Sequence, residues 1–387
     1  MKSLILSCNT GEGHNSCAKA IKEYYDSIGE VCEIKDALEF ISPKVSTIIS
    51  RGHSYIYRHL PWLFKWGYGY AEKHPAVFYY NSGIYKFMTQ GTERMYEYIQ
   101  HGKYDTVICT HALTALMLTD MLKKHPIKIA TCFVATDYTC SPSTKDSDLD
   151  YYFIPDNEFA PDFECKNITQ EKLISSGIPV RQMFYVTCAT EEAKESVDVS
   201  PDHKHLLLMC GSMGCGPMKK LLHKLSEHLP EDWELSVICG NNKKLADRLE
   251  KKYRENKRIH IRGFVKDMGT MMDSADLYLT KPGGISVSEA AVKNLPMVFI
   301  DAVAGCEEYN RLHFIRKGGA RTGNTINELN DICLSLMQSD ERRSIMKEKL
   351  AGLEKRNSAK IICETMKKHR EKMYDNEQTD EMQPSDC

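Results

Sequence analysis

The chain has 387 residues, which is more than a single hydrophobic core usually serves, so its length favours two domains. Its 51 basic and 53 acidic residues give a formal charge of -2, which excludes a general electrostatic attraction for nucleic acid. No segment reaches the roughly 20 apolar residues that span a bilayer. The fifteen cysteines form no Cys-x-x-Cys pair and no signal peptide precedes the first strand, which indicates free thiols in the cytoplasm.

The first half of the chain alternates short apolar strands with helical patterns. Strands are predicted over residues 2–8, 31–36, 106–109 and 128–134, and a helix over 112–124. A turn at residues 9–14 follows the first strand and opens a helix whose Ala18, Ile21, Tyr25 and Ile28 share one face, until Gly29 ends it. This alternation predicts a parallel sheet.

The second half repeats this plan after a polar, acidic stretch at residues 177–201, which reads as a linker. A strand at 206–210, a glycine turn and a helix at 217–229 come first, and strands at 233–239, 258–262, 277–280 and 297–300 follow. We therefore predict an α/β protein with an N-terminal domain over 1–185, a second domain over 201–345, a helical segment over 346–374 and an acidic disordered tail over 375–387.

Three glycine turns lie between a strand and a helix, at residues 11–14, 211–216 and 282–286. Such turns aim backbone N–H groups at an anion, and the helix dipole adds favourable potential there, so they suit phosphates. Each alone is equally consistent with a plain tight turn. The first also partly matches a dinucleotide fingerprint that ends at Asp36, but Ser16 stands where its third glycine belongs, which disfavours a dehydrogenase.

The third turn is followed by polar residues in a regular order. Lys281 precedes the turn, Glu289 lies one helical turn later, and Glu307 and Asn310 follow the next strand. Glu289 is predicted to accept ribose hydroxyls while the amides of 284–286 meet a diphosphate, and Glu307 or Asn310 would hold sugar hydroxyls. The alternative is that Glu289 is a solvent-exposed residue near a helix N-terminus and binds no ligand.

Residues 51–88 combine positive charge with aromatic rings. They contain five basic residues and one acidic residue, and the rings include Trp62, Phe64 and Trp66. Rings that prefer the headgroup zone, interleaved with cations, are typical of binding to an anionic membrane surface. We therefore predict that these three rings face lipid, with packing inside a helical core as the alternative.

Four segments together resemble a known family. They are Gly11-Glu-Gly-His14, Thr136-Asp137-Tyr138, residues 263–268 (Gly-Phe-Val-Lys-Asp-Met) and residues 281–290, which begin Lys-Pro-Gly-Gly. Over nearly its whole length the chain resembles the plant-type monogalactosyldiacylglycerol synthases and bacterial processive diacylglycerol glucosyltransferases, which are distantly akin to the enzyme that forms lipid II.

The resemblance implies an inverting, metal-independent glycosyltransferase of the B type, with two Rossmann-like domains facing each other across a cleft. Its donor would be a UDP-hexose, with glucose or galactose transferred to the 3-hydroxyl of diacylglycerol or a related glycolipid. The enzyme would be peripheral on the inner face of the cell membrane, without a cofactor and without a nucleic-acid partner. The acceptor would bind the N-terminal half and the nucleotide sugar the C-terminal half.

By motif position, the resemblance places Phe264, Val265 and Met268 around the uracil, Ser212 and Gly214 near the phosphates, and Glu289 on the ribose. The full set of donor-binding residues predicted from turns and motifs together is Gly11, Gly13, Ser212, Gly214, Phe264, Val265, Met268, Lys281, Gly283, Gly284, Ile285, Ser286, Glu289, Gly305, Cys306, Glu307 and Asn310.

This chain also departs from the family pattern. Relatives usually carry Gly-Gln-Glu where Gly305-Cys306-Glu307 stands, which leaves the identity of the hexose open. Many bacterial relatives have a histidine and a tryptophan at the positions of Ser141 and Thr144, which leaves the acceptor side open.

The predicted catalytic residues are His14 and Asp137, since both end strands at the sheet edge where α/β proteins bind ligands. A histidine suits a general base at neutral pH, and Asp137 would act directly or orient it. The alternative is a helix cap for His14 and a turn for Asp137. The Asp-x-Asp within residues 146–150 is assigned to a solvated loop, and no metal site is expected. Two other functions stay open, a nucleotide-sugar epimerase of the same plan and a binding protein without catalysis.

Overall fold

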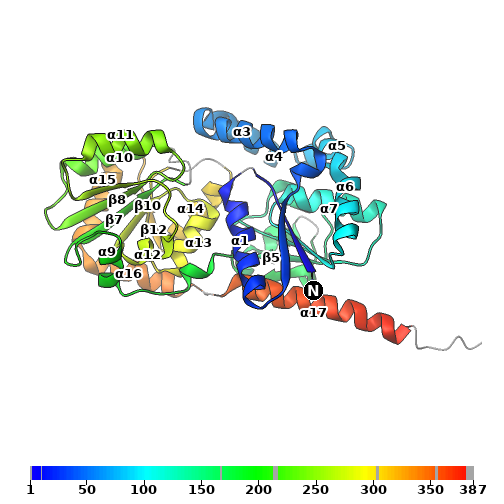
Figure 1. Ribbon diagram of the computed structural model, residues 1–387. Helices are drawn as coiled ribbons and strands as arrows, with labels where there is room; N and C mark the ends of the chain where they lie inside the picture. The colour runs from blue at the N-terminus through cyan, green and yellow to red at the C-terminus, as the bar shows by residue number, and fades with distance from the viewer. Residues whose placement is uncertain are drawn as a thin grey trace, which may run out of the picture. The chain divides into compact units, whose positions relative to one another are not determined.

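The computed structural model describes residues 2–9, 11–165, 168–211, 217–301, 305–353 and 356–380. Within these ranges the description leaves out the side chains of residues 53, 54, 57–59, 61, 64, 65, 75 and 376–380. The chain forms two compact units, the first made of Met1–Arg181 with Arg356–Cys387 and the second of Gln182–Lys355 (Figure 1). Each unit is an α/β layer structure with its own parallel sheet.

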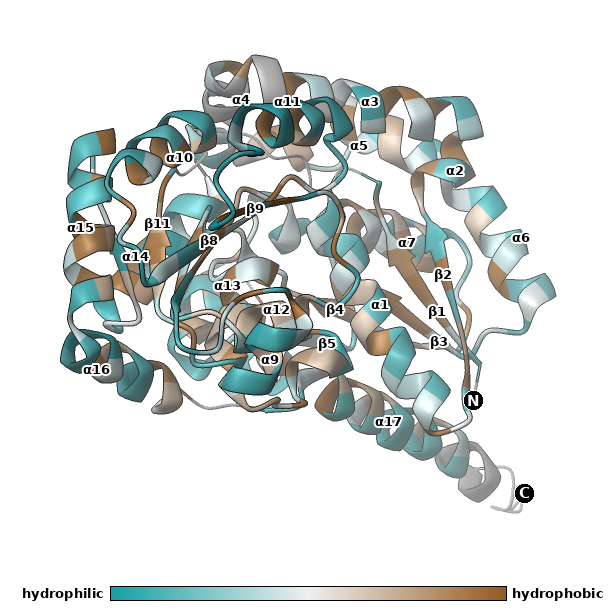
Figure 2. Ribbon diagram, turned by 60° about the vertical axis from the view of Figure 1, so that its left-hand side comes forward, coloured by the Kyte–Doolittle hydropathy of each residue, from teal (hydrophilic) through white to brown (hydrophobic). Residues whose placement is uncertain are grey.

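The first unit is built on a six-stranded parallel sheet in the order β2-β1-β3-β4-β5-β6. Its strands are β1 (Lys2–Ser7), β2 (Val31–Asp36), β3 (Thr106–Cys109), β4 (Ala130–Val134), β5 (Tyr151–Ile154) and β6 (Leu173–Ser175). The central strands are apolar along nearly their whole length because helices cover both faces of a parallel sheet. They form the brown centre of the unit in Figure 2.

The helices of the first unit begin where the sequence supplies caps or prolines. Ser42 accepts a hydrogen bond from the Lys44 amide with Pro43 at the first helical position, and His111 accepts one from the Leu113 amide. The helices are α1 (Glu12–Ser27), α2 (Leu38–Ile41), α3 (Pro43–His59), α4 (Pro61–Lys73), α5 (Gly83–Met88), α6 (Thr92–Gly102), α7 (Ala112–Lys124), α8 (Ala160–Glu164) and α17 (Ser358–Asp380).

The second unit repeats the plan with a parallel sheet in the order β12-β11-β10-β7-β8-β9. Its strands are β7 (Lys204–Met209), β8 (Trp233–Ile238), β9 (Ile259–Arg262), β10 (Leu277–Thr280), β11 (Met297–Phe299) and β12 (Ala320–Thr322). Its helices are α9 (Thr190–Ser196), α10 (Met218–Glu227), α11 (Lys243–Tyr253), α12 (Met268–Asp273), α13 (Gly284–Val292), α14 (Cys306–Arg316), α15 (Ile326–Gln338) and α16 (Asp340–Ala351). The leucines of β7, α10 and α11 meet in one buried core.

Strand order locates the place in each sheet where a ligand fits. In an open parallel sheet, ligands bind at the carboxyl ends of the strands where the direction of winding reverses. That point lies between β1 and β3 in the first unit and between β7 and β10 in the second. Ligand binding is therefore expected at the loops that follow these four strands.

The C-terminal helix returns to the first unit. α17 packs against α1 and β4, with Ile362 and Met366 fully buried, and Arg370 Nη1 lies 3.0 Å from Asp105 Oδ2. This differs from the expected separate segment over 346–374, because residues 346–351 end α16 in the second unit while residues from 356 onward complete the first. The helix continues to Asp380, so residues 375–380 are not disordered as expected, and 381–387 lie outside the described residues.

Three further expectations need correction. The stretch at 177–201 is not an open linker, since it contains α9 and buries Ala193 completely. Ile28 is 45% exposed, so it does not share the buried face of α1. The strands β5, β6 and β12 were not predicted.

Candidate active site

In the first unit, three strand ends bring polar side chains together at the winding reversal. His14 stands on the first turn of α1 after β1, Thr110 follows β3, and Thr136 follows β4. His14 Nδ1 lies 2.8 Å from the Thr110 carbonyl oxygen and 3.1 Å from Thr136 Oγ1. Asp137 is the next residue and is half-buried. The predicted pair His14 and Asp137 therefore belongs to one cluster of loops.

These contacts decide which nitrogen of His14 carries the proton. A carbonyl oxygen only accepts hydrogen bonds, so in the neutral ring Nδ1 carries hydrogen and donates it to Thr110. The Nε2 atom then holds the lone pair. This is the arrangement that a general base requires, with one nitrogen anchored and the other able to take a proton.

His111 is a member of the cluster that the sequence interpretation missed. Its ring centroid lies 4.4 Å from that of His14, with 59° between the ring planes. Its Nδ1 accepts a hydrogen bond of 3.1 Å from the Leu113 amide at the start of α7. A signal was available, because a histidine directly after a buried strand and before a helix lies at the same sheet edge as His14.

In the second unit, the loop after β10 opens directly into the N-terminus of α13. Gly283 precedes that helix with a φ of -69°, and a Cβ placed on it would meet no described atom within 4 Å. Neither backbone strain nor packing within the chain therefore requires glycine at this position. Open space beside backbone N–H groups at a helix N-terminus suits a phosphate.

Two buried side chains carry opposite charges beside this loop. Lys281 Nζ lies 3.9 Å from Glu307 Oε2, and their side chains are only 6% and 12% exposed. The Asn310 side chain is fully buried, and its Nδ2 donates a 2.9 Å hydrogen bond to the Pro282 carbonyl. Asn310 thus supports the loop from below, whereas the sequence offered it as a direct contact to sugar hydroxyls.

Glu289 is half-buried in α13, the helix that follows β10 in the chain. Burial is the main cause that raises the pKa of Tyr278, and the negative charge of Glu289 raises it further. Ser286 and the buried Ile285 occupy the first turn of the same helix.

The remaining predicted donor residues lie on neighbouring loops. Phe264 is 66% exposed after β9, and the half-buried Val265 and Met268 lead into α12, whose first turn is capped by Asp267. Gly305 precedes α14 with a φ of 93°, a conformation that favours glycine, and Cys306 begins that helix half-buried. In the first unit, Gly11 and Gly13 flank the start of α1. Ser212 and Gly214 lie outside the described residues.

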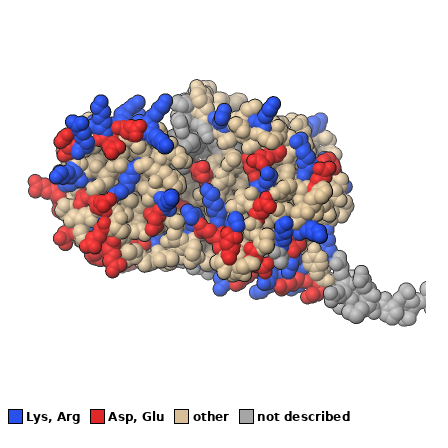
Figure 3. Space-filling model, viewed as in Figure 1, with Lys and Arg blue, Asp and Glu red and all other residues tan. Residues whose placement is uncertain are grey.

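The predicted lipid-facing residues lie on α4. The rings of Trp62 and Trp66 are 65% and 64% exposed, while the side chain of Phe64 is outside the description. Ile48 and Tyr55 on α3 are also exposed, at 69% and 61%. In Figure 3 basic side chains stand among uncharged ones over these helices. The alternative of packing inside a helical core therefore does not apply to Trp62 and Trp66.

Comparison with known proteins matches each half of the chain to a family model. Residues 14–180 match the model of monogalactosyldiacylglycerol (MGDG) synthase, and residues 205–363 match the glycosyltransferase family 28 C-terminal domain. A processive diacylglycerol beta-glucosyltransferase of Bacillus licheniformis is 25% identical over 97% of both chains, and that of Bacillus subtilis is 25% identical over 96% of both.

Solved structures share the fold at low identity. MurG of Acinetobacter baumannii superposes with a TM-score of 0.63 at 13% identity, over 95% of this chain and 100% of its own. The UDP-GlcNAc 2-epimerase of Neisseria meningitidis gives 0.62 at 14% identity, over 95% and 100%. At this identity the likeness shows architecture alone, so it does not separate transferase from epimerase.

The two matched models and the paired parallel sheets define a glycosyltransferase of the two-domain B type. Within that class the chain carries an MGDG synthase domain over residues 14–180 and a family 28 C-terminal domain over residues 205–363. The predicted family and the predicted α/β class with two Rossmann-like sheets are thus confirmed.

Proposed function

We propose that this enzyme transfers glucose or galactose from a UDP-hexose to the 3-hydroxyl of diacylglycerol or a related glycolipid. The observation that carries the proposal is the polar cluster at the winding reversal of each sheet, one centred on His14 and one on Lys281 and Glu289. The near full-length relatives named for diacylglycerol glucosyl transfer support the acceptor class.

The donor is assigned to the second unit. The amides at the start of α13 would hold the diphosphate, helped by the Lys281 ammonium, and Glu289 would accept the ribose hydroxyls. Phe264 offers an exposed ring for the uracil. Fixed donors around the departing diphosphate stabilise the charge that develops on it, which is why we propose transfer without a metal.

His14 is assigned as the base. Its anchored Nδ1 directs Nε2 to take the proton of the acceptor hydroxyl as the oxygen attacks the anomeric carbon and UDP departs. One attack from the face opposite to UDP inverts the anomeric configuration. Asp137, beside Thr136, would stabilise the imidazolium that forms.

The acceptor is proposed to reach the site at a membrane surface, in keeping with a peripheral enzyme on the inner face of the cell membrane. In the described chain, none of the helices has the length and hydropathy of a membrane span. The exposed Trp62 and Trp66, within a segment of five basic residues and one acidic residue, would insert among anionic headgroups.

The deciding experiment supplies labelled UDP-glucose or UDP-galactose with dioleoylglycerol in mixed micelles. Wild type is expected to form glycolipid and to release UDP only when lipid is present. His14→Gln should lower kcat by about 10²- to 10⁴-fold without weakening UDP binding. His101→Gln is the matched control, since His101 also bonds a carbonyl through Nδ1 (to Glu97, 2.8 Å) but is exposed near the end of α6.

Two results would refute the proposal. One is conversion of the nucleotide sugar without lipid, which would point to an epimerase. The other is equal activity of His14→Gln and His101→Gln. Vesicle sedimentation separately tests the membrane surface: Trp62→Ala with Trp66→Ala should reduce binding to phosphatidylglycerol vesicles, while Ile345→Ala with Tyr374→Ala, exposed elsewhere, should not.

A further inference from the structure

We propose that His111 is a positioning residue that holds the ring of His14 in its reactive orientation, an inference that rests on the proposed role of His14 as the base. His111 follows β3, whose neighbours in the sheet are β1 and β4. It is thus placed between the strand that leads to His14 and the strand that leads to Thr136.

The His111 ring is itself firmly held. Its carbonyl accepts the Thr114 amide at 3.0 Å and Thr114 Oγ1 at 2.7 Å, which fixes the backbone to the first turn of α7. Its Nδ1 accepts the Leu113 amide, which fixes the ring. α7 is anchored in turn by Ala115 and Leu116, both fully buried. A side chain fixed at both backbone and ring can serve as a rigid wall.

Such a wall can restrict the orientation of the His14 ring. The bonds at Nδ1, to Thr110 and Thr136, hold one edge of that ring, and by themselves these two bonds do not prevent a tilt about that edge. The His111 ring, 4.4 Å away and inclined by 59°, limits this tilt. Nε2 lies across the ring from the anchored edge. The tilt therefore determines the direction in which the Nε2 lone pair points.

His111 also suits a site where positive charge develops. A proton on its Nδ1 would face the Leu113 N–H, so that hydrogen bond favours the neutral ring with hydrogen on Nε2. When His14 takes the proton of the acceptor, its neighbour therefore remains uncharged. A cationic residue at the same distance would oppose the proton transfer.

Two substitutions separate the contact of the His111 ring with His14 from the role of His111 as the N-cap of α7. His111→Asn keeps a side-chain acceptor for the Leu113 amide, since asparagine is a good N-cap, but removes the ring. His111→Phe keeps the ring and removes the acceptor. If the ring positions His14, kcat should fall about tenfold in His111→Asn and less in His111→Phe, whereas thermal stability should fall more in His111→Phe. The KM for the UDP-hexose should stay unchanged in both.

Combining variants shows whether His111 acts through His14. In a His14→Gln background, adding His111→Asn should change kcat by less than twofold, because the group that it positions is gone. The inference is overturned if His111→Asn alone stays within twofold of wild type. It is also overturned if kcat follows thermal stability across the variants, or if His111→Asn has its full effect without His14.

A readout independent of activity separates this inference from the proposed function. NMR relaxation of labelled histidine rings should show a lower order parameter for the His14 ring in His111→Asn than in the wild type, while hydrogen stays on Nδ1 in both because the Thr110 carbonyl is unchanged. If the His14 ring becomes less ordered while the wild type transfers no sugar, positioning stands and the proposed function fails. An equally ordered His14 ring in His111→Asn would overturn the positioning role whatever the activity.

Discussion

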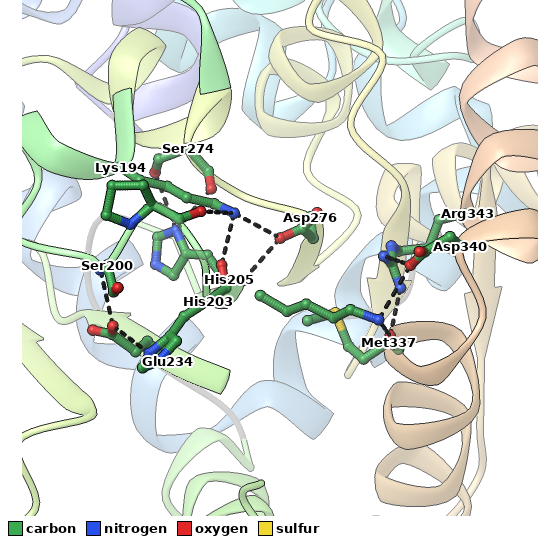
Figure 4. Close-up of polar contacts among 12 residues, drawn as sticks. Lys194, Ser200, His203, His205, Glu234, Ser274, Asp276, Met337, Asp340 and Arg343 are labelled. Atoms are coloured by element: carbon green, nitrogen blue, oxygen red, sulfur yellow. Dashed lines mark hydrogen bonds and ion pairs between the residues drawn. The ribbon is translucent and has the colours of Figure 1, made fainter. Parts of the chain in front are cut away.

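His205 is a buried histidine in β7, and its protonation should destabilise the second unit as the pH falls. Its Nδ1 lies 3.2 Å from the Ser274 carbonyl oxygen and its Nε2 lies 2.8 Å from Ser236 Oγ. Figure 4 shows the ring beside Ser274. The carbonyl accepts from Nδ1, so Nε2 accepts the Ser236 hydroxyl and the ring is neutral. Burial lowers the pKa of His205 to about 4, although the bond to Ser274 opposes this.

The sign and size of the effect follow from this lowered pKa. In the unfolded chain the imidazole titrates near its ordinary value of 6.5, so between pH 6.5 and 4 the unfolded state binds a proton that the folded state refuses. Stability is therefore complete above pH 6.5 and is lost as the pH falls towards 4. At about 1.4 kcal/mol per pH unit the full loss is about 3 kcal/mol, of which about 2 kcal/mol falls between pH 7 and 4.5.

Urea unfolding at pH 7 and pH 4.5 measures this loss. His205→Gln keeps hydrogen-bonding groups for both serines without a titrating ring, so its free energy of unfolding should depend on pH by about 2 kcal/mol less than that of wild type. The exposed His101→Gln should behave as wild type. Equal pH dependence in wild type and His205→Gln would refute the reasoning.

Three further outcomes are expected. Lys293→Met should cost about 3 to 5 kcal/mol in urea unfolding, because it leaves the buried Asp273 carboxylate without the ammonium at 2.6 Å; similar losses for an exposed lysine such as Lys347→Met would contradict this. Asn310→Ala should weaken UDP binding about tenfold in calorimetry by freeing the Pro282 carbonyl, and undiminished affinity would show that the loop needs no such support. Transfer activity should survive EDTA, whereas its loss and recovery with a divalent cation would establish a metal requirement.

The strands that carry the site were predictable because their sequences contain little besides apolar residues. β1 and β3 are buried on both faces, and such runs followed by glycine or a polar turn stand out. β6 and β12 have only three residues each and are partly exposed, so no apolar run marks them. Their existence depends on pairing with β5 and β11, which local sequence does not express.

The positions of His14 after the first strand and of Glu289 in the helix that follows β10 could be predicted, because both follow from local sequence patterns. A role that depends on what lies opposite in space could not be predicted in this way. In the sequence Asn310 looks like a ligand-binding residue, but its side-chain amide donates a hydrogen bond to the carbonyl of Pro282, twenty-eight positions earlier. His111 meets His14 across a separation of 97 positions, and only the strand order brings the two rings together.

The path of α17 bears on how the protein is made. A ribosome releases the second unit as one uninterrupted stretch, whereas the first unit lacks the helix that packs against α1 and β4 until the whole second unit has been made. Ile362 and Met366 of α17 are fully buried in the folded protein. Until α17 has been made, the apolar surface of the first unit that these side chains cover stays exposed on the nascent chain. A nascent chain arrested near residue 350 should therefore recruit a chaperone to its first unit. The chaperone should be released when α17 emerges from the ribosome.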